Sequence, residues 1–112
     1  MKIYHNPRCR KSRETLAIIH QKDIQVEIIE YLTNVPSSSE LKEIISKLNI
    51  SPFELIRRGE KDFKDNYKGK ELSSEEWIEA MIKYPKLIER PIVVKEDRAV
   101  LGRPPENVLE LI

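Results

Sequence analysis

Residues 2–19 read KIYHNPRCRKSRETLAII and contain the signals that decide the fold. The first four residues are typical of a short strand, which ends at Asn6-Pro7, and the apolar residues of 16–19 then follow helical spacing. Residues 25–31, QVEIIEY, begin with strict polar and apolar alternation, which predicts a second strand. A strand, a helix and a strand in this order predict a parallel pair with a right-handed crossover.

The C-terminal part of the sequence predicts an antiparallel pair. Two apolar stretches, 92–94 and 99–101, flank a polar turn at 95–98, which is the pattern of a β-hairpin. The turn residues 102–105 then lead into a last helix. These signals together predict an α/β fold with a mixed four-stranded sheet, half parallel and half antiparallel, flanked by helices.

Three more helices are predicted between the second strand and the hairpin, each with a serine as its cap. They begin after Ser37, Ser51 and Ser73. The second of them is short, carries residues 55–58 and is expected to end at Gly59.

Residues 59–72, GEKDFKDNYKGKEL, are dominated by charge and are predicted to form a long surface loop. A mobile lid and an ordinary solvated loop are both compatible with this composition.

Length and charge limit the functions that are open to the chain. At 112 residues it is expected to form one domain, 1–112, and by default a monomer. Lysine plus arginine (20) nearly balances aspartate plus glutamate (19), which disfavours nucleic acid as a partner. No stretch approaches the roughly 20 apolar residues of a membrane span, and the first residues lack the pattern of a signal peptide. We therefore expect a cytoplasmic protein with no membrane partner.

The single cysteine, Cys9, is expected to lie between the first strand and its helix. One cysteine cannot form an internal disulfide, and with only His5 and His20 beside it there are too few soft ligands for a structural metal site. The N-terminus of a helix favours the thiolate form of a cysteine, because unpaired N–H groups and the helix dipole stabilise negative charge. Cys9 is therefore a candidate nucleophile.

Four basic residues surround this cysteine where a helix would normally carry acidic ones: Arg8, Arg10, Lys11 and Arg13. The cluster predicts an anion site, in which the same N–H groups hold a phosphate-like oxyanion against the thiolate. The loop of cysteine phosphatases is disfavoured, since it needs an arginine at position 15, where this chain has Thr15.

Two polar residues close to Cys9 are candidates for tuning the reactivity of its thiolate. Ser12 stands where dithiol oxidoreductases have their second cysteine, so it either donates to the thiolate or makes a first-turn backbone contact. His5 ends the strand and either tunes the thiolate by charge or simply packs. Arg10 is a further candidate for tuning the thiolate.

Three arginines stand at the junctions of predicted elements: Arg57, Arg90 and Arg103. If they meet at Cys9, their bidentate guanidinium groups match a tetrahedral oxyanion. Spacing alone does not show that they converge.

Four separated motifs, HNPRCRKSRETL, LIRR, ERPIVV and LGRPPENVLEL, together resemble the glutaredoxin-coupled arsenate reductases over nearly the full length. The resemblance implies a thioredoxin-like core with a helical insertion, and a cis-proline at Pro91 beside the active cysteine. It also implies arsenate as substrate, glutathione as co-substrate, glutaredoxin as partner and no bound cofactor or metal.

By the same resemblance, Cys9 is the catalytic nucleophile, and Arg57, Arg90 and Arg103 bind arsenate and stabilise the covalent adduct. The LIRR motif leaves Arg58 as an alternative to Arg57. His5 matches the histidine that the family has near its cysteine.

Two alternatives remain open. Spx-type regulators resemble this family, bind RNA polymerase and perform no arsenate chemistry. They lack the arginine that follows the hairpin glycine, whereas this chain has Gly102-Arg103, and many of them carry a CxxC motif that is absent here. The other alternative is a family member that acts on another thiol-transfer substrate.

Overall fold

The computed structural model describes all 112 residues of the chain. They form two compact units: unit 1 comprises residues 1–34 and 90–112, and unit 2 comprises residues 35–89. A single domain over 1–112 stays a prediction. None of the helices has the length and apolar character needed to cross a membrane.

Unit 1 is built on a four-stranded sheet in the order β2-β1-β3-β4. The strands are β1 (Lys2–His5), β2 (Glu27–Glu30), β3 (Ile92–Lys95) and β4 (Arg98–Leu101). Strand β1 pairs in parallel with β2 and antiparallel with β3, and β3 pairs antiparallel with β4. The predicted mixed α/β sheet is therefore confirmed.

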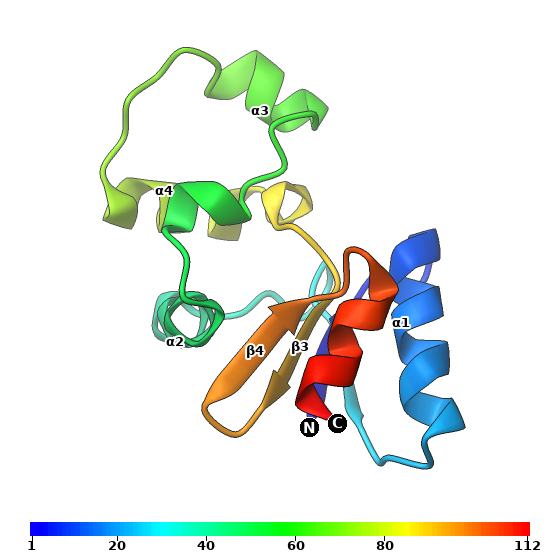
Figure 1. Cartoon of the computed structure of the whole chain (residues 1–112). Helices are drawn as coiled ribbons and strands as arrows, with labels where there is room; N and C mark the ends of the chain where they lie inside the picture. Colours follow the sequence, from blue (N-terminus) through cyan, green and yellow to red (C-terminus); the bar gives the residue numbers. More distant parts are fainter. The chain divides into compact units, whose positions relative to one another are not determined.

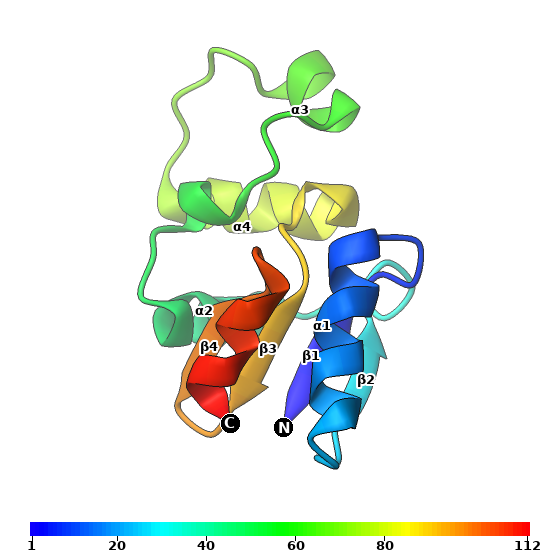
Figure 2. The same ribbon diagram turned by 45° about the vertical axis from the view of Figure 1, so that its right-hand side comes forward.

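Helix α1 (Arg10–Gln21) and the 3₁₀ helix η3 (Pro105–Leu111) lie side by side against this sheet (Figure 2). Their inward side chains meet those of the strands in one apolar cluster, in which each buried aliphatic side chain stabilises the fold by about 1.5–3 kcal/mol. The cluster consists of Ile3, Ile19, Val93, Val108 and Leu111. The predicted last helix thus exists, with the tighter 3₁₀ geometry.

Unit 2 is the helical insertion between β2 and β3 (Figure 1). Its elements are α2 (Ser38–Leu48), η1 (Pro52–Leu55), α3 (Lys61–Asn66), α4 (Ser74–Lys83) and η2 (Pro85–Leu87). The caps of Ser37 and Ser73 are present, since each hydroxyl accepts a hydrogen bond from a backbone N–H of its helix.

The prediction of a long loop over 59–72 was wrong, because α3 lies within it. Phe63 is 9% exposed, and its ring centroid lies 6.2 Å from that of Trp77. Lys61 and Asp65 form an ion pair one helical turn apart. An aromatic anchor and one charge pair thus support a six-residue helix within this charged stretch.

The prediction that a helix carries residues 55–58 and ends at Gly59 was also wrong. The 3₁₀ helix ends at Leu55, and Ile56 forms an antiparallel bridge with Ile88. Ile56 is 2% exposed, and the N–H of Arg57 donates to the carbonyl of Leu87 at 2.7 Å. Burial of a β-branched side chain and an isolated backbone bridge outweigh the local helical pattern.

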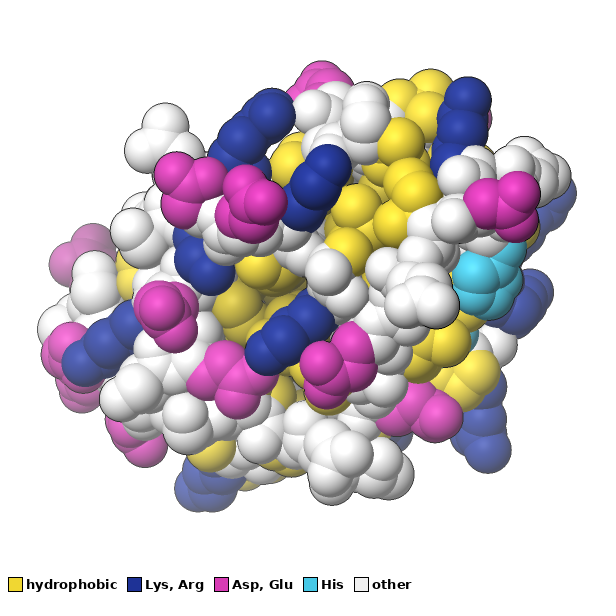
Figure 3. All heavy atoms as spheres, turned by 90° about the horizontal axis from the view of Figure 1, so that it is seen from below, with side chains coloured by type: hydrophobic (Ala, Val, Ile, Leu, Met, Phe, Trp, Pro, Cys, Tyr) yellow, Lys and Arg dark blue, Asp and Glu magenta, His cyan; other side chains and the backbone are white.

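Charged side chains of both signs are interspersed on the face of the molecule drawn in Figure 3. They surround areas of hydrophobic side chains without forming a patch of one sign. This agrees with the near balance of 20 basic and 19 acidic residues.

Candidate active site around Cys9

Cys9 is the N-cap residue of α1, at the end of the loop that follows β1. Its backbone is extended (φ −92°, ψ 122°), and its N–H donates to the carbonyl of Asn6 at 3.0 Å. No side chain caps this helix, and no acidic residue lies in its first turn. The N–H groups that a serine or aspartate would usually satisfy therefore remain for the thiol.

The pKa of Cys9 lies below the ordinary thiol value as the balance of opposing effects. Burial, the largest effect, raises it. The backbone N–H of Ser12, the charge of Arg90, the backbone N–H of Lys11 and a hydrogen bond from Arg90 together lower it by more. The site therefore favours the thiolate, which is the nucleophilic form of cysteine.

The pairing of the strands explains how Arg90 reaches Cys9. Tyr4 of β1 faces Ile92 of β3, so the residues before β3 lie at the edge of the sheet where β1 ends. Cys9 follows that end of β1 and Arg90 precedes β3, which brings two distant parts of the sequence together.

Arg103 reaches the same edge from β4. Leu101, the last residue of β4, faces Ile92, and Arg103 follows two residues later. Its guanidinium Nη1 donates to the carbonyl of Arg90 at 3.5 Å. The structure thus gathers Cys9, Arg90 and Arg103 at one edge of the sheet in unit 1.

The peptide bond between Arg90 and Pro91 is cis, which agrees with the expectation from the family resemblance. The bond between Arg103 and Pro104 is also cis, and the sequence analysis did not anticipate it.

Sequence reasoning gave no structural role to two residues of this region, Thr15 and Gly102. Thr15 is fully buried, and the N–H of Gly102 donates to the carbonyl of Pro91 at 2.9 Å. A Cβ at position 102 would lie 2.7 Å from Cγ of Pro91 and would also overlap the Thr15 hydroxyl. The only signal in the sequence is that a glycine stands directly before Arg103.

Ser12 lies in the first turn of α1 and is fully buried. Its hydroxyl lies 2.6 Å from Nδ1 of His5 and accepts a hydrogen bond from the N–H of Asn6 at 3.0 Å. The backbone N–H of Ser12 is the part that acts on Cys9. The proposed substrate contact of the Ser12 side chain stays a prediction.

His5 is 6% exposed, and its pKa lies below the ordinary value. Burial is the main cause of the lowering, Glu30 opposes it and Arg13 adds to it. His5 is therefore largely neutral near pH 7, and its hydrogen bond with Ser12 ties the end of β1 to α1. A role of its charge in tuning Cys9 stays a prediction.

The basic side chains beside Cys9 point in several directions. Arg10 Nε pairs with Glu14 at 2.8 Å and is largely exposed, and Arg13 Nη1 donates to the carbonyl of Pro7 at 3.0 Å. Neither is among the main causes that lower the pKa of Cys9, so tuning by Arg10 also stays a prediction.

Arg57 and Arg58 belong to unit 2. Arg57 is half-buried, with Glu60 at 3.5 Å and Glu89 at 3.8 Å from its guanidinium. The guanidinium of Arg58 stacks over the ring of Phe53 at 4.8 Å. Each arginine has its own structural partners within this unit.

The sequence model of the ArsC family matches residues 4–111. The chain belongs to the ArsC family. The resemblance noted from the four motifs is thereby confirmed at the level of the ArsC family. The mixed sheet and the solved relative described below confirm the thioredoxin-like core.

Individual ArsC-related proteins are similar over nearly their full length. The uncharacterized protein YfgD of Escherichia coli K12 is 44% identical, over 100% of this chain and 96% of that protein. A Haemophilus influenzae protein named arsenate reductase is 45% identical, over 98% and 97%. The solved structure of an arsenate reductase from Vibrio cholerae superposes with a TM-score of 0.94 at 44% identity, covering 100% and 98%.

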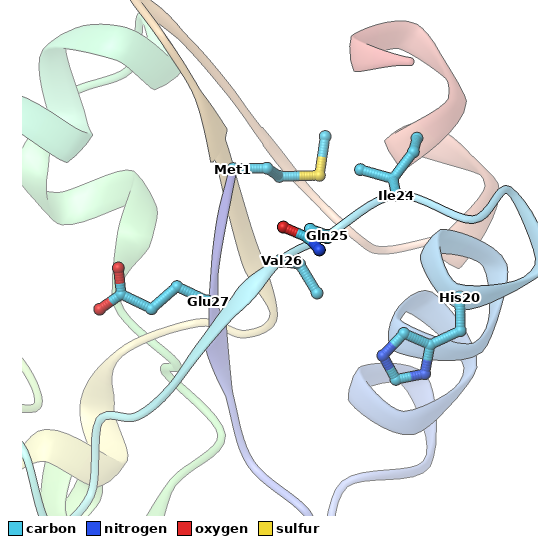
Figure 4. A pocket seen from close by; sticks show the side chains of 6 residues that line it. All are labelled: Met1, His20, Ile24, Gln25, Val26 and Glu27. Atoms are coloured by element: carbon cyan, nitrogen blue, oxygen red, sulfur yellow. The ribbon is translucent and has the colours of Figure 1, made fainter.

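A surface pocket of this ArsC-family chain lies at the end of unit 1 where β1 begins (Figure 4). Its lining includes Met1, His20 from α1 and the residues that lead into β2. Its lining contains no cysteine and no arginine, and Cys9 lies beyond the opposite end of β1. No group of three or more His, Cys, Asp and Glu side chains is placed to hold a metal ion.

Proposed function

We propose that this chain is an arsenate reductase in which the Cys9 thiolate is the nucleophile. The observation that carries the proposal is the placement of Arg90 against Cys9 at an uncapped helix start, with a thiol pKa that is lowered despite burial. Membership of the ArsC family and similarity to proteins named arsenate reductase support the choice of oxyanion.

In the first step, the thiolate attacks arsenic and a sulfur–arsenic bond forms. An arsenic–oxygen bond breaks, and the oxygen leaves as water after protonation, so arsenic stays in the pentavalent state. Negative charge on the remaining oxygens falls close to the guanidinium of Arg90 and the first N–H groups of α1. Arg103 is proposed as the second arginine that binds these oxygens.

The reduction requires thiols from outside the chain, because Cys9 is its only cysteine. Glutathione adds to the arsenic of the adduct and displaces a second oxygen as water. A glutaredoxin thiolate then attacks the glutathione sulfur, forming a disulfide bond, while the sulfur–arsenic electron pair passes to arsenic and reduces it to the trivalent state. Water displaces Cys9, arsenite leaves, and the thiolate is restored. A second glutathione regenerates glutaredoxin, so two thiols are oxidised for each arsenate.

Arg57 is proposed as a third arginine for the substrate, with Arg58 as the alternative from the LIRR motif. The two can be separated by comparing Arg57→Ala with Arg58→Ala in the same assay. If Arg57 acts on arsenate, only its removal raises the arsenate KM, and the reverse result assigns the role to Arg58.

The proposed reaction suits the cytoplasm, where thiols are kept reduced. A monomer meets its requirements, since each chain contributes one complete Cys9 centre.

The test is arsenate-dependent NADPH oxidation with glutathione, glutaredoxin and glutathione reductase, run with the wild type and with Cys9→Ser. Activity that falls by at least about 100-fold in the variant supports the proposal, since a serine hydroxyl is a far weaker nucleophile at neutral pH. A wild type that does not reduce arsenate, although its Cys9 is reactive toward alkylating agents, contradicts it. That result would favour a different thiol-transfer substrate or an Spx-like regulatory contact.

A further inference from the structure

Three segments of unit 1 meet at Gly102 with almost no space between them. They are the first turns of α1 through Thr15, the start of β3 through Pro91, and the turn after β4 through Gly102. An added Cβ at Gly102 would lie 2.7 Å from Cγ of Pro91 and 3.0 Å from Cγ2 of Thr15, and closer still to the Thr15 hydroxyl. Only a glycine, which has no Cβ, allows the backbone at position 102 to come this close to the side chains of Thr15 and Pro91.

Burial and hydrogen bonds hold the residues of this contact in place. Thr15 is fully buried, and its hydroxyl donates to the carbonyl of Lys11 at 2.8 Å. The longer distance of 3.4 Å to the carbonyl of Gly102 indicates that Thr15 meets the glycine mainly by packing. The N–H of Gly102 is used by the carbonyl of Pro91 at 2.9 Å.

The contact lies one residue from each arginine of the site. Arg90 directly precedes Pro91, and Arg103 directly follows Gly102. Any displacement of Gly102 away from Thr15 and Pro91 therefore moves both guanidinium groups relative to α1, whose first turn carries Cys9. A close-packed region transmits such a shift because it has little free volume to absorb it.

We propose that Thr15 and Gly102 are positioning residues, whose contact with each other and with Pro91 sets Arg90 and Arg103 against Cys9. In this proposal they act through the two arginines. The inference rests on the proposed function for its role in catalysis, whereas the position of Arg90 relative to Cys9 can be tested without arsenate.

The decisive variant is Gly102→Ala, with Gly59→Ala as its control. A Cβ at Gly59 meets nothing within 4 Å, so the control adds the same methyl group without a contact. The readout is the pKa of Cys9, followed by the ultraviolet absorbance of the thiolate, in protein that circular dichroism shows to be folded. We expect Gly102→Ala to lower the thiolate fraction at neutral pH by about threefold or more, because Arg90 moves away from the sulfur. We expect Gly59→Ala to leave it unchanged.

A rescue experiment separates positioning from a general loss of stability. Thr15→Ala removes two of the three atoms that an alanine at position 102 would meet. The double variant Thr15→Ala/Gly102→Ala should therefore recover part of the thiolate fraction that Gly102→Ala loses, although each single change alone reduces it. If Gly102→Ala does not fold, Thr15→Ala alone provides the test, and it should raise the Cys9 pKa by a smaller amount.

A folded Gly102→Ala protein with the wild-type Cys9 pKa overturns the inference, and so does a double variant that is no better than Gly102→Ala. A lowered melting temperature with an unchanged Cys9 pKa also overturns it, since the contact would then serve stability alone. None of these readouts needs arsenate. A chain that fails to reduce arsenate but shows the expected pKa changes contradicts the proposed function and leaves this inference standing.

Discussion

The two helix starts at α1 and α4 follow opposite rules. At α4, the Ser73 hydroxyl accepts from the N–H of Glu76 at 3.2 Å, and the Glu76 carboxylate accepts from the N–H of Ser73 at 2.9 Å. Acidic side chains fill its first turn. At α1, the N-cap is Cys9, with no side-chain cap and no acidic residue in the first turn. Helix α4 uses its own side chains to bind N–H groups at its start, whereas α1 leaves such groups for the Cys9 thiol.

The difference shows where the chain gives up local stability for chemistry. An N-cap such as Ser73 is worth about 1 kcal/mol, and acidic residues in the first turn add a few tenths through the helix dipole. Helix α1 forgoes both contributions. The same N–H groups lower the pKa of Cys9 instead, with the help of Arg90. Substitutions at these two helix starts, and at the arginines Arg90 and Arg103 beside α1, test this difference between α1 and α4.

The largest effect is expected from Arg90→Ala. Loss of a positive charge beside the sulfur disfavours the thiolate, so the pKa of Cys9 rises and the midpoint of its alkylation rate moves to higher pH. If the proposed function holds, kcat/KM for arsenate falls about 100-fold, as on removal of a donor for developing negative charge. Arg98→Ala, an exposed arginine of β4, is the control. An unchanged alkylation midpoint in Arg90→Ala would contradict the assignment.

A smaller loss is expected from Arg103→Ala. Arg103 donates to the backbone carbonyl of Arg90, and it is not among the main causes of the Cys9 pKa. The variant should keep the alkylation profile of the wild type and raise the arsenate KM about tenfold, the usual worth of a hydrogen bond to a charged group. Steady-state kinetics and thermal unfolding should be measured together. A parallel fall in melting temperature would make Arg103 structural.

Ser73→Ala should affect stability alone. Losing this cap is expected to lower the free energy of unfolding by about 1 kcal/mol, measured by urea titration, without changing the reactivity of Cys9. A changed alkylation rate would show that the two helix starts are not independent.

The wild-type cap should also depend on pH. Hydrogen bonds from the backbone N–H and then the side chain of Ser73 lower the pKa of Glu76. Because the folded pKa is the lower one, the contribution of Glu76 is present above its unfolded pKa and is lost as the pH falls through the folded pKa. Unfolding at decreasing pH should therefore show a smaller effect of Ser73→Ala under acid conditions.

The smallest effect is expected from Lys11→Glu, which gives α1 the acidic first turn that α4 has. The new carboxylate should stabilise the helix by about 0.3–1 kcal/mol. The same charge repels the thiolate, so the alkylation rate of Cys9 at neutral pH should fall by about threefold or less. Lys11→Gln separates loss of the cation from gain of the anion. A variant with both a higher stability and a faster alkylation of Cys9 would contradict this difference between the two helix starts.

Features that depend on neighbouring residues could be predicted from the sequence. The cap at Ser73 joins residues three positions apart, and the polar turn at 96–97, within the predicted 95–98, joins two adjacent strands. Such signals are complete within a few residues, so the sequence contains all that is needed to recognise them.

Features that depend on residues far apart in the sequence could not be predicted from it. Helix α3 needs the contact of Phe63 with Trp77, and the extended backbone at Ile56 needs Ile88. The local pattern predicted a loop in the first case and a helix in the second, and tertiary packing decided both.

The same limit applies to the site. The position of Cys9 at a helix start was readable, and so were Arg90 and Arg103 at junctions. Tuning of the thiol was assigned to its sequence neighbours His5 and Arg10, whereas the main side-chain contribution comes from Arg90. Only the pairing of β1 with β3 brings Arg90 there, and the packing of Thr15 against Gly102 depends on the same tertiary arrangement.

Cys9 is partly exposed and is the only thiol in the chain, which makes it a single attachment point for covalent probes. A maleimide dye or a spin label reacts at one known position, and intact-protein mass spectrometry reports its occupancy directly. A mixed disulfide formed with a partner protein cannot be resolved from within this chain, because no second sulfur is present to displace the first. Such a complex persists until an outside thiol arrives, so trapping on non-reducing gels can identify the proteins that donate electrons to this centre.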